Sequence, residues 1–202
     1  GPGSGKTRTL THRIAYLLAA KKAWPSQILA LTFTNKAARE MRSRVVDLVG
    51  EEAKGMWIGT FHAIFARVLR READKIGFSR DFTIYDSDAT ERLIKELMTR
   101  YGVDPKRVTP RSVRSAISGA KNSMVGPDEY ARLAGDPFTE AAAKLYTPYA
   151  AALRKANAMD FDDLLGMPIR LFEAHPETLK EYQRRWRYLH IDEYQDTNRT
   201  QY

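Results

Sequence analysis

The sequence of 202 residues contains no cysteine, and none of its apolar runs is long enough to cross a membrane. The first absence excludes disulfide bonds and thiolate metal sites, and it fits a protein of the reducing cytoplasm. The second excludes a transmembrane helix, which needs about 20 mostly apolar residues. No secretory signal is visible in the sequence either. We therefore expect a cytoplasmic protein that has no membrane partner.

Acidic residues are fewer than basic ones, with 25 Asp and Glu against 33 Lys and Arg and a net charge of +8. The basic surplus lies towards the N-terminus, since residues 1–86 contain 15 basic and 8 acidic residues, whereas residues 161–202 contain 6 and 8. Such a surplus is typical of proteins that bind an anionic partner such as nucleic acid. A solvated basic surface that binds nothing would explain the charge equally well.

Glycine is concentrated at the start of the chain, where residues 1–7 read Gly-Pro-Gly-Ser-Gly-Lys-Thr. Glycines let the backbone turn tightly and point its N–H groups at an anion. Lys6 can reach the β- and γ-phosphates of a nucleotide, and the Thr7 hydroxyl can ligate Mg²⁺. A helical pattern follows at once, which places the loop at a helix N-terminus. The alternative is a flexible glycine-rich terminus or a tag remnant.

The phosphate-loop pattern G-x-x-x-x-G-K-S/T is incomplete, because its first position falls before residue 1. The strand that should precede such a loop is also missing from the sequence. We therefore expect a fragment that begins inside its own motif.

Strand and helix patterns alternate over residues 1–86 and return after residue 160, which predicts an α/β protein with a parallel sheet and helices on both faces. Between them, residues 87–159 show helical patterns and no convincing strand, which predicts an inserted all-helical subdomain. We expect Asn35 to cap the helix that follows it. Strands are expected at residues 28–33, 56–60, 82–85 and 188–191, and helices from residue 87 onward at 87–101, 110–122, 138–157, 160–174 and 176–186.

The last predicted strand ends in two adjacent acids, Asp192 and Glu193. Because strand C-termini and a phosphate loop lie along the same edge of a parallel sheet, Asp192 can hold the Mg²⁺ that Thr7 also binds. Glu193 is then placed to orient and deprotonate an attacking water. A capping or solvated pair of acids is the alternative, which the phosphate loop upstream disfavours.

Five segments in this order and spacing resemble the front part of a UvrD/Rep/PcrA-type superfamily 1 DNA helicase. They are Gly1–Arg8, Ala30–Ala38, Gly59–His62, Asp160–Leu165 and Asp192–Asn198. The resemblance covers essentially the whole chain, and the Asp-Glu-Tyr-Gln-Asp-Thr run is its most diagnostic part. It implies an incomplete RecA-like P-loop domain over residues 1–86 and 160–202, with the helical subdomain inserted at residues 87–159.

The resemblance also implies a function and roles for the matched residues. It implies an ATP-dependent 3′–5′ DNA helicase or translocase of single-stranded DNA, which acts at single-strand/duplex junctions in repair or replication restart, with repair proteins as further partners. Catalytic roles fall to Lys6, Glu193 and Gln195, with Gln195 sensing the γ-phosphate. ATP contacts are implied for Gly1, Pro2, Gly3, Ser4, Gly5, Lys6, Thr7 and Arg8, and Mg²⁺ contacts for Thr7 and Asp192. The single-stranded DNA path is implied for Thr32, Phe33, Asn35, Thr60, Phe61 and His62.

Simple physical chemistry supports this DNA path. An exposed aromatic ring at a strand end offers a base-stacking surface worth about 1–3 kcal/mol, although Phe33 could equally end a buried strand. His62 could instead cap a helix or lie in the core. In the helical insertion, Arg111, Arg114 and Lys121 fall near one helix face, which fits either DNA contact or a solvated surface.

Other functions fit part of the pattern. A helicase subunit of a recombination-type helicase–nuclease would share every motif, and a nucleic-acid-binding module without ATPase activity could retain the fold. A small-molecule kinase would share the loop, but it would have no use for the DNA-path motifs. Since the family pattern continues beyond residue 202, we expect this fragment alone to be inactive as an ATPase.

Overall fold

The computed structural model describes residues 5–198 and 200–202, and the contacts within the chain divide it into two units. Unit 1 consists of the described residues of Gly1–Arg67 and Leu171–Gln201, and unit 2 consists of Val68–Arg170 with Tyr202. Helices α3 (Phe61–Glu72) and α8 (Phe161–Ala174) each begin in one unit and end in the other. The fold is of the mixed α/β class that the sequence predicts.

Unit 1 is built on a three-stranded parallel sheet in the order β2–β1–β5. The strands are β1 (Ile28–Thr32), β2 (Trp57–Thr60) and β5 (Tyr188–Ile191). The register pairs Thr32 with Thr60 and Leu31 with Ile191, so the carboxyl ends of all three strands meet at one edge. The three strands lie where the sequence predicts them.

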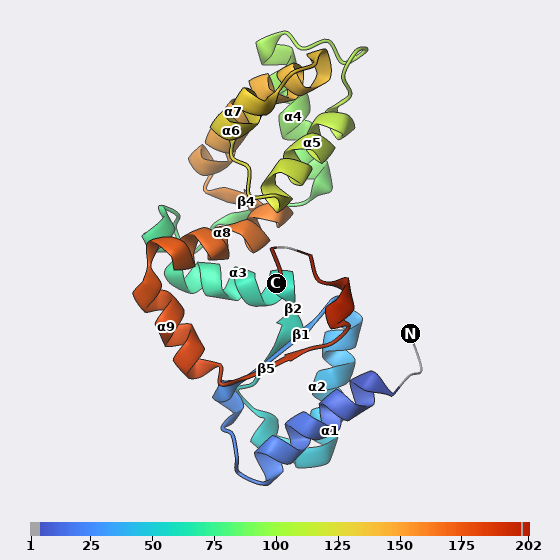
Figure 1. Cartoon of the computed structure of the whole chain (residues 1–202), viewed down its shortest axis with the longest axis vertical. Helices are drawn as coiled ribbons and strands as arrows, with labels where there is room; N and C mark the ends of the chain where they lie inside the picture. The colour runs from blue at the N-terminus through green and yellow to red at the C-terminus, as the bar shows by residue number, and fades with distance from the viewer. Residues whose placement is uncertain (1–4, 199) are drawn as a thin grey trace. The chain divides into compact units, whose positions relative to one another are not determined.

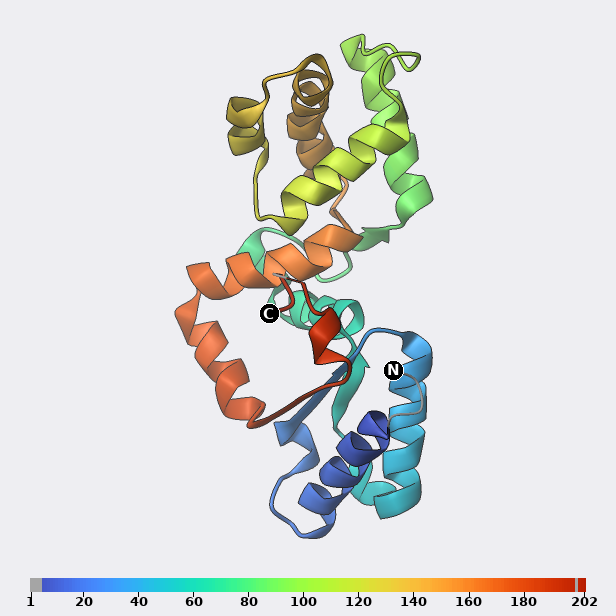
Figure 2. The ribbon, with the colours of Figure 1, turned by 45° about the vertical axis from the view of Figure 1, so that its right-hand side comes forward.

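Helices cover both faces of this sheet, as Figures 1 and 2 show. Helices α1 (Lys6–Ala19) and α2 (Asn35–Val49) lie on one side, where their apolar residues pack against Ala30 and Ile58 in a buried cluster. Helix α9 (Pro176–Arg185) lies on the other side. There Trp186, just after α9, packs edge-on against Trp57 of β2 with ring centroids 5.2 Å apart. Short 3₁₀ turns precede β1 at Pro25–Gln27 and follow α2 at Gly50–Ala53.

The start of α2 differs by one residue from the prediction. Thr34, not Asn35, is the N-cap, because its hydroxyl accepts a hydrogen bond from the Ala37 N–H at 3.1 Å. Asn35 is the first residue of the helix, and its side chain is exposed. Both Thr and Asn are good N-cap residues, so composition alone does not choose between neighbours.

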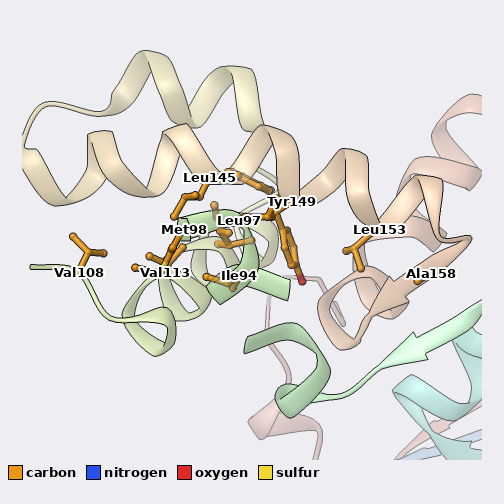
Figure 3. Close-up of a cluster of buried hydrophobic side chains, with 12 residues drawn as sticks. Ile94, Leu97, Met98, Val108, Val113, Leu145, Tyr149, Leu153 and Ala158 are labelled. Atoms are coloured by element: carbon orange, nitrogen blue, oxygen red, sulfur yellow. The ribbon is translucent and has the colours of Figure 1, made fainter. Parts of the chain in front are cut away.

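Unit 2 has a helical core. It contains α4 (Ser87–Tyr101), α5 (Pro110–Asn122), α6 (Pro127–Leu133) and α7 (Pro137–Lys155), and a 3₁₀ turn at Ala73–Ile76 lies ahead of them. Figure 3 shows its buried side chains, among them Ile94, Leu145 and Tyr149, which point towards one another from α4 and α7. The sequence predicts α4, α5 and α7, but it misses the seven-residue α6, whose described residues include none that is buried.

A second sheet in unit 2 corrects the prediction of a single sheet. Strand β3 (Thr83–Tyr85) does not join β1 and β2 but pairs in parallel with β4 (Ala158–Asp160). The sequence predicts β3 as part of the main sheet and does not predict β4. Each strand has only three residues, which is too short for an alternating pattern to stand out.

A buried ionic cluster lies where β4 meets α8. The Lys121 ammonium of α5 lies 2.7 Å from Asp160 Oδ2 and 2.9 Å from Asp163 Oδ1, and these three side chains are only 11%, 6% and 12% exposed. The Tyr149 hydroxyl of α7 donates to Asp160 Oδ2 at 2.7 Å. Asp160 and Asp163 also accept hydrogen bonds from each other's backbone N–H groups, at 2.8 and 3.2 Å. The cluster therefore ties α5, α7 and β4 to the first turn of α8.

Two carboxylates share one ammonium in this cluster, and their pKa values diverge. Burial raises the pKa of Asp163 to about 6, against the opposing charge of Lys121. Burial acts in the same direction on Asp160, but the charge and hydrogen bonds of Lys121 outweigh it and hold the pKa of that carboxyl below its usual value. Lys121 itself has a raised pKa, because the two carboxylates outweigh the effect of its burial.

Among the residues that the structure describes, no helix is long and apolar enough to cross a membrane.

Removing the shared cation should destabilise unit 2. We expect Lys121→Met to lower the free energy of unfolding by about 3–5 kcal/mol, because it leaves two like charges buried without a counter-charge. Urea denaturation, monitored by the circular dichroism signal of the helices, measures this change. The matched control is Lys144→Met in α7, whose exposed side chain should alter the value by less than about 0.5 kcal/mol. Equal effects of the two substitutions would contradict the structural role of the cluster.

Candidate functional site

The threonine of the predicted phosphate loop and the aspartate that follows β5 meet directly, although 185 positions separate them in the sequence. The Thr7 hydroxyl lies 3.0 Å from Asp192 Oδ2 and 3.2 Å from Asp192 Oδ1. Thr7 is held in the first turn of α1, which starts at Lys6 after Gly5 in the left-handed conformation (φ 76°). Gly1, Pro2, Gly3 and Ser4, also predicted to bind the nucleotide, lie outside the described residues. Arg8 is exposed on α1.

The sheet fixes Asp192 at this position. Asp192 directly follows β5, and its backbone N–H donates to the Leu31 carbonyl of β1 at 3.0 Å. Its carboxylate is buried and faces the Thr7 hydroxyl. One carboxylate and one hydroxyl from opposite ends of the chain form the oxygen donor set that Mg²⁺ takes beside waters and phosphate oxygens. The two residues therefore fit a magnesium site completed by a nucleotide.

Glu193 lies next to Asp192 in an unusual backbone conformation. It has φ 54° and ψ 45°, in the left-handed region that residues other than glycine rarely adopt. A 3₁₀ turn over Tyr194–Asp196 follows, closed by a 2.9 Å hydrogen bond from the Asp196 N–H to the Glu193 carbonyl. Within this turn the Gln195 side-chain amide donates to Glu193 Oε2. Both predicted residues thus lie beside Asp192 and contact each other.

Two aromatic rings from the predicted DNA path pack together at the carboxyl edge of the sheet. Phe33 follows β1 and Phe61 follows β2, with ring centroids 5.5 Å apart. Phe33 is 36% exposed, whereas Phe61 is only 2% exposed. Of the two rings, Phe33 is therefore the one that is open to solvent, and it packs against the buried ring of Phe61.

The polar residues predicted for the same path divide in a similar way. Thr32 is fully buried and donates to the Thr34 carbonyl at 3.1 Å, so its hydroxyl shapes the turn after β1. The Thr60 hydroxyl accepts from the Ala63 N–H at 3.2 Å, at the start of α3. Asn35 is exposed, and His62 is half-buried beside them.

The sequence predictions gave no role to two residues that support this edge. Arg42 of α2 donates to the Ile58 carbonyl of β2 at 2.9 Å, which ties the helix after Phe33 to the strand before Phe61. Gly59 leaves little room for a side chain, since a Cβ there would lie 3.2 Å from Ile64. Arg42 has no sequence signal, because a charged residue at its position reads as a solvated helix face. Gly59 does have one, as a glycine inside a strand.

The basic face predicted on α5 is largely neutralised within unit 2. Lys121 is buried between two carboxylates, and Arg114 Nε lies 3.1 Å from Glu91 Oε1. Arg111 is exposed. The interpretation of these three residues as one DNA-contacting face is therefore wrong for Lys121, whose charge is already satisfied.

Comparison with known proteins agrees with these motifs. The family model described as "UvrD/REP helicase N-terminal domain" matches residues 1–202. The chain is 48% identical over its full length to "ATP-dependent DNA helicase PcrA" of Bacillus subtilis and 50% identical to the protein of that name from Staphylococcus epidermidis. It covers 27% and 28% of those two proteins, so it spans little more than a quarter of their length. On the match over all its residues, the chain belongs to the UvrD/REP helicase N-terminal domain family.

Proposed function

We propose that this chain is the ATP-binding front part of an ATP-dependent DNA helicase or single-stranded DNA translocase. The contact of the Thr7 hydroxyl with the Asp192 carboxylate is the observation that supports this most directly, because it brings together the two residues proposed to hold Mg²⁺. The PcrA relatives bear the name of ATP-dependent DNA helicases, which favours DNA as the track. The 3′–5′ polarity and a role in repair or replication restart belong to the same proposal.

The nucleotide site would divide its work among few residues. Lys6 would neutralise the β- and γ-phosphates, together with the N–H groups of the loop and the N-terminus of α1. Thr7 and Asp192 would hold Mg²⁺, which when bound offsets the charge of the phosphate oxygens. Arg8 would be a minor contact to the nucleotide. The proposal extends to Gly1, Pro2, Gly3, Ser4 and Gly5, which would contribute backbone N–H groups.

Hydrolysis would use Glu193 as the general base. The oxygen of a water forms a bond to the γ-phosphorus, and the bond from that phosphorus to the β–γ bridging oxygen breaks. The bridging oxygen leaves with the electron pair on ADP, and the Glu193 carboxylate takes the proton of the water. Gln195, in the same turn, would sense the γ-phosphate.

The DNA strand would run along the carboxyl edge of the sheet. Phe33 would stack on a base, since its ring is partly exposed and rests on Phe61. Asn35 and His62 would contact the phosphate backbone without reading sequence. Thr32, Thr60 and Phe61 would act through the turns and the ring that they support, since each makes an internal contact.

We propose further that residues 1–86 and 160–202 are parts of a RecA-like P-loop domain with residues 87–159 inserted as a helical subdomain. The parallel order β2–β1–β5 and the Thr7–Asp192 contact support the first part. The helices α4 to α7 support the second.

ATP turnover should depend on DNA. In a protein of the relatives' length that contains this chain, we expect single-stranded DNA to raise the ATPase rate at least tenfold, because DNA engagement completes the motor cycle. Lys6→Ala should abolish turnover in both conditions, since the phosphate charge loses its counter-charge. A coupled phosphate-release assay measures both effects. An ATPase that ignores DNA would refute the translocase function.

Removing the proposed base should separate binding from hydrolysis. Glu193→Gln keeps the size of the side chain but cannot accept the proton, so we expect the catalytic rate to fall about 10²–10⁴-fold. ATP affinity should change little, because Mg²⁺ is assigned to Thr7 and Asp192. Single-turnover hydrolysis and equilibrium binding of a fluorescent ATP analogue distinguish the two effects. Normal turnover by this variant would show that another group is the base.

Phe33 should matter for DNA and not for ATP. We expect Phe33→Ala to weaken single-stranded DNA binding about 5- to 150-fold, the loss of one base-stacking contact. Fluorescence anisotropy of a labelled oligonucleotide at fixed salt measures it. The matched control is Trp24→Ala, which removes a 75% exposed ring at the other end of the same strand, before β1. Equal losses in both variants would exclude a specific stacking role for Phe33.

A further inference from the structure

The proposed general base, Glu193, makes a side-chain contact with Gln195 in the turn after β5. Gln195 Nε2 donates to Glu193 Oε2, and the two residues belong to one tight turn. The turn is fixed at both ends, by the Asp196 N–H on the Glu193 carbonyl at 2.9 Å and by the Thr197 N–H on the Tyr194 carbonyl at 3.1 Å. The Thr197 hydroxyl donates to the same Tyr194 carbonyl at 2.8 Å.

The backbone of Glu193 explains why this contact forms. With φ 54° and ψ 45°, Glu193 bends the chain sharply after Asp192 and starts the turn that carries Gln195. If residue 193 were extended, the side chains of residues 193 and 195 would lie on the same side of a strand, and no turn would fold one against the other. A left-handed non-glycine residue is strained, and such strain persists only where the surroundings impose it. Here the buried Asp192 on one side and the 3₁₀ turn on the other impose it.

The contact has a consequence for the chemistry. A carboxylate that accepts a hydrogen bond from an amide has one lone pair fewer for an attacking water, and its orientation is set by the amide. A general base must lie within hydrogen-bond reach of the proton that it removes. Any donor that pulls the Glu193 carboxylate to one side therefore competes with the water for it.

We propose that Gln195 is a positioning residue that restrains Glu193 in the absence of DNA and releases it when DNA engagement lets its own amide turn towards the γ-phosphate. This inference rests on the proposed ATPase function and adds a regulatory step to it. The planar amide moves as one group, so a rotation of the side chain that carries the amide nitrogen to a phosphate oxygen also carries it away from the Glu193 carboxylate. Phosphate oxygens are charged acceptors, as the carboxylate is, so they can take over the N–H donor that Glu193 loses. Sensing of the γ-phosphate and release of the base are then one movement.

The experiment compares ATPase rates without and with single-stranded DNA, in a protein of the relatives' length that contains this chain. Gln195→Ala and Gln195→Met both remove the donor, and Met keeps the length of the side chain. We expect each to raise the DNA-independent catalytic rate about three- to tenfold, the effect of one solvent-exposed hydrogen bond of ordinary net strength. The KM for ATP measured without DNA should change less than twofold, because Thr7 and Asp192 are unaltered and Gln195 then contacts Glu193 and not the phosphate. Stimulation by DNA should shrink by the same factor.

Gln201→Ala is the matched control, a glutamine six positions later whose Oε1 accepts from the Asn198 N–H at 3.0 Å. It should leave the DNA-independent rate and the KM unchanged. If the DNA-independent rate stays the same or falls in both Gln195 variants while the unaltered protein is stimulated by DNA, the restraint is refuted and the proposed function stands. If the unaltered protein is not stimulated by DNA, the proposed function itself fails. A rise with Ala but not with Met would also overturn the restraint, since loss of the donor alone would then not suffice.

Discussion

The hydrogen bond between Thr7 and Asp192 is the contact on which the candidate site depends. Neither residue could reach the other without the sheet, because β5 must pair beside β1 to place Asp192 next to the start of α1. The parallel arrangement matters because it directs every strand's carboxyl end to one edge. A buried carboxylate also needs a donor, and the Thr7 hydroxyl supplies it. Fold and chemistry thus meet in one contact.

The same edge explains how the proposed nucleotide site and the proposed DNA path can adjoin. Phe33, Phe61 and Asp192 each follow the last residue of a strand in one sheet. The two rings divide their roles by burial, since Phe61 lies in the core and Phe33 rests on it with a partly exposed face. Arg42 ties α2 to β2 beneath them. The turn after β5 therefore lies close to Phe33, because β5 and β1 are neighbouring strands. A change in that turn occurs near the surface that is proposed to hold DNA.

The sequence predicts well what depends on local pattern. The strands of the main sheet are predicted from short apolar runs, and the helices α4, α5 and α8 from apolar spacing. Prediction fails where the paired strands are far apart in the sequence or very short. Strands β3 and β4 have three residues each and come together across more than 70 positions, so neither the separate sheet nor β4 leaves a readable pattern. The prediction of the N-cap of α2 fails for a different reason. Thr34 and Asn35 are both suitable N-cap residues, and only the backbone conformation selects Thr34.

The surroundings of a charged side chain are the feature that the sequence predicts least well. A lysine on a helix face looks the same in the sequence whether it faces water or two carboxylates, and Lys121 proves to be buried between Asp160 and Asp163. Those aspartates are part of the Asp-Phe-Asp-Asp segment that resembles a helicase motif, so at least part of that motif maintains the fold of unit 2. The basic residues paired inside unit 2 add nothing to the field that a DNA strand would meet, because their charge is cancelled within the protein. Residues 1–86, with 15 basic and 8 acidic residues, carry most of the net charge of +8 that would attract a DNA strand.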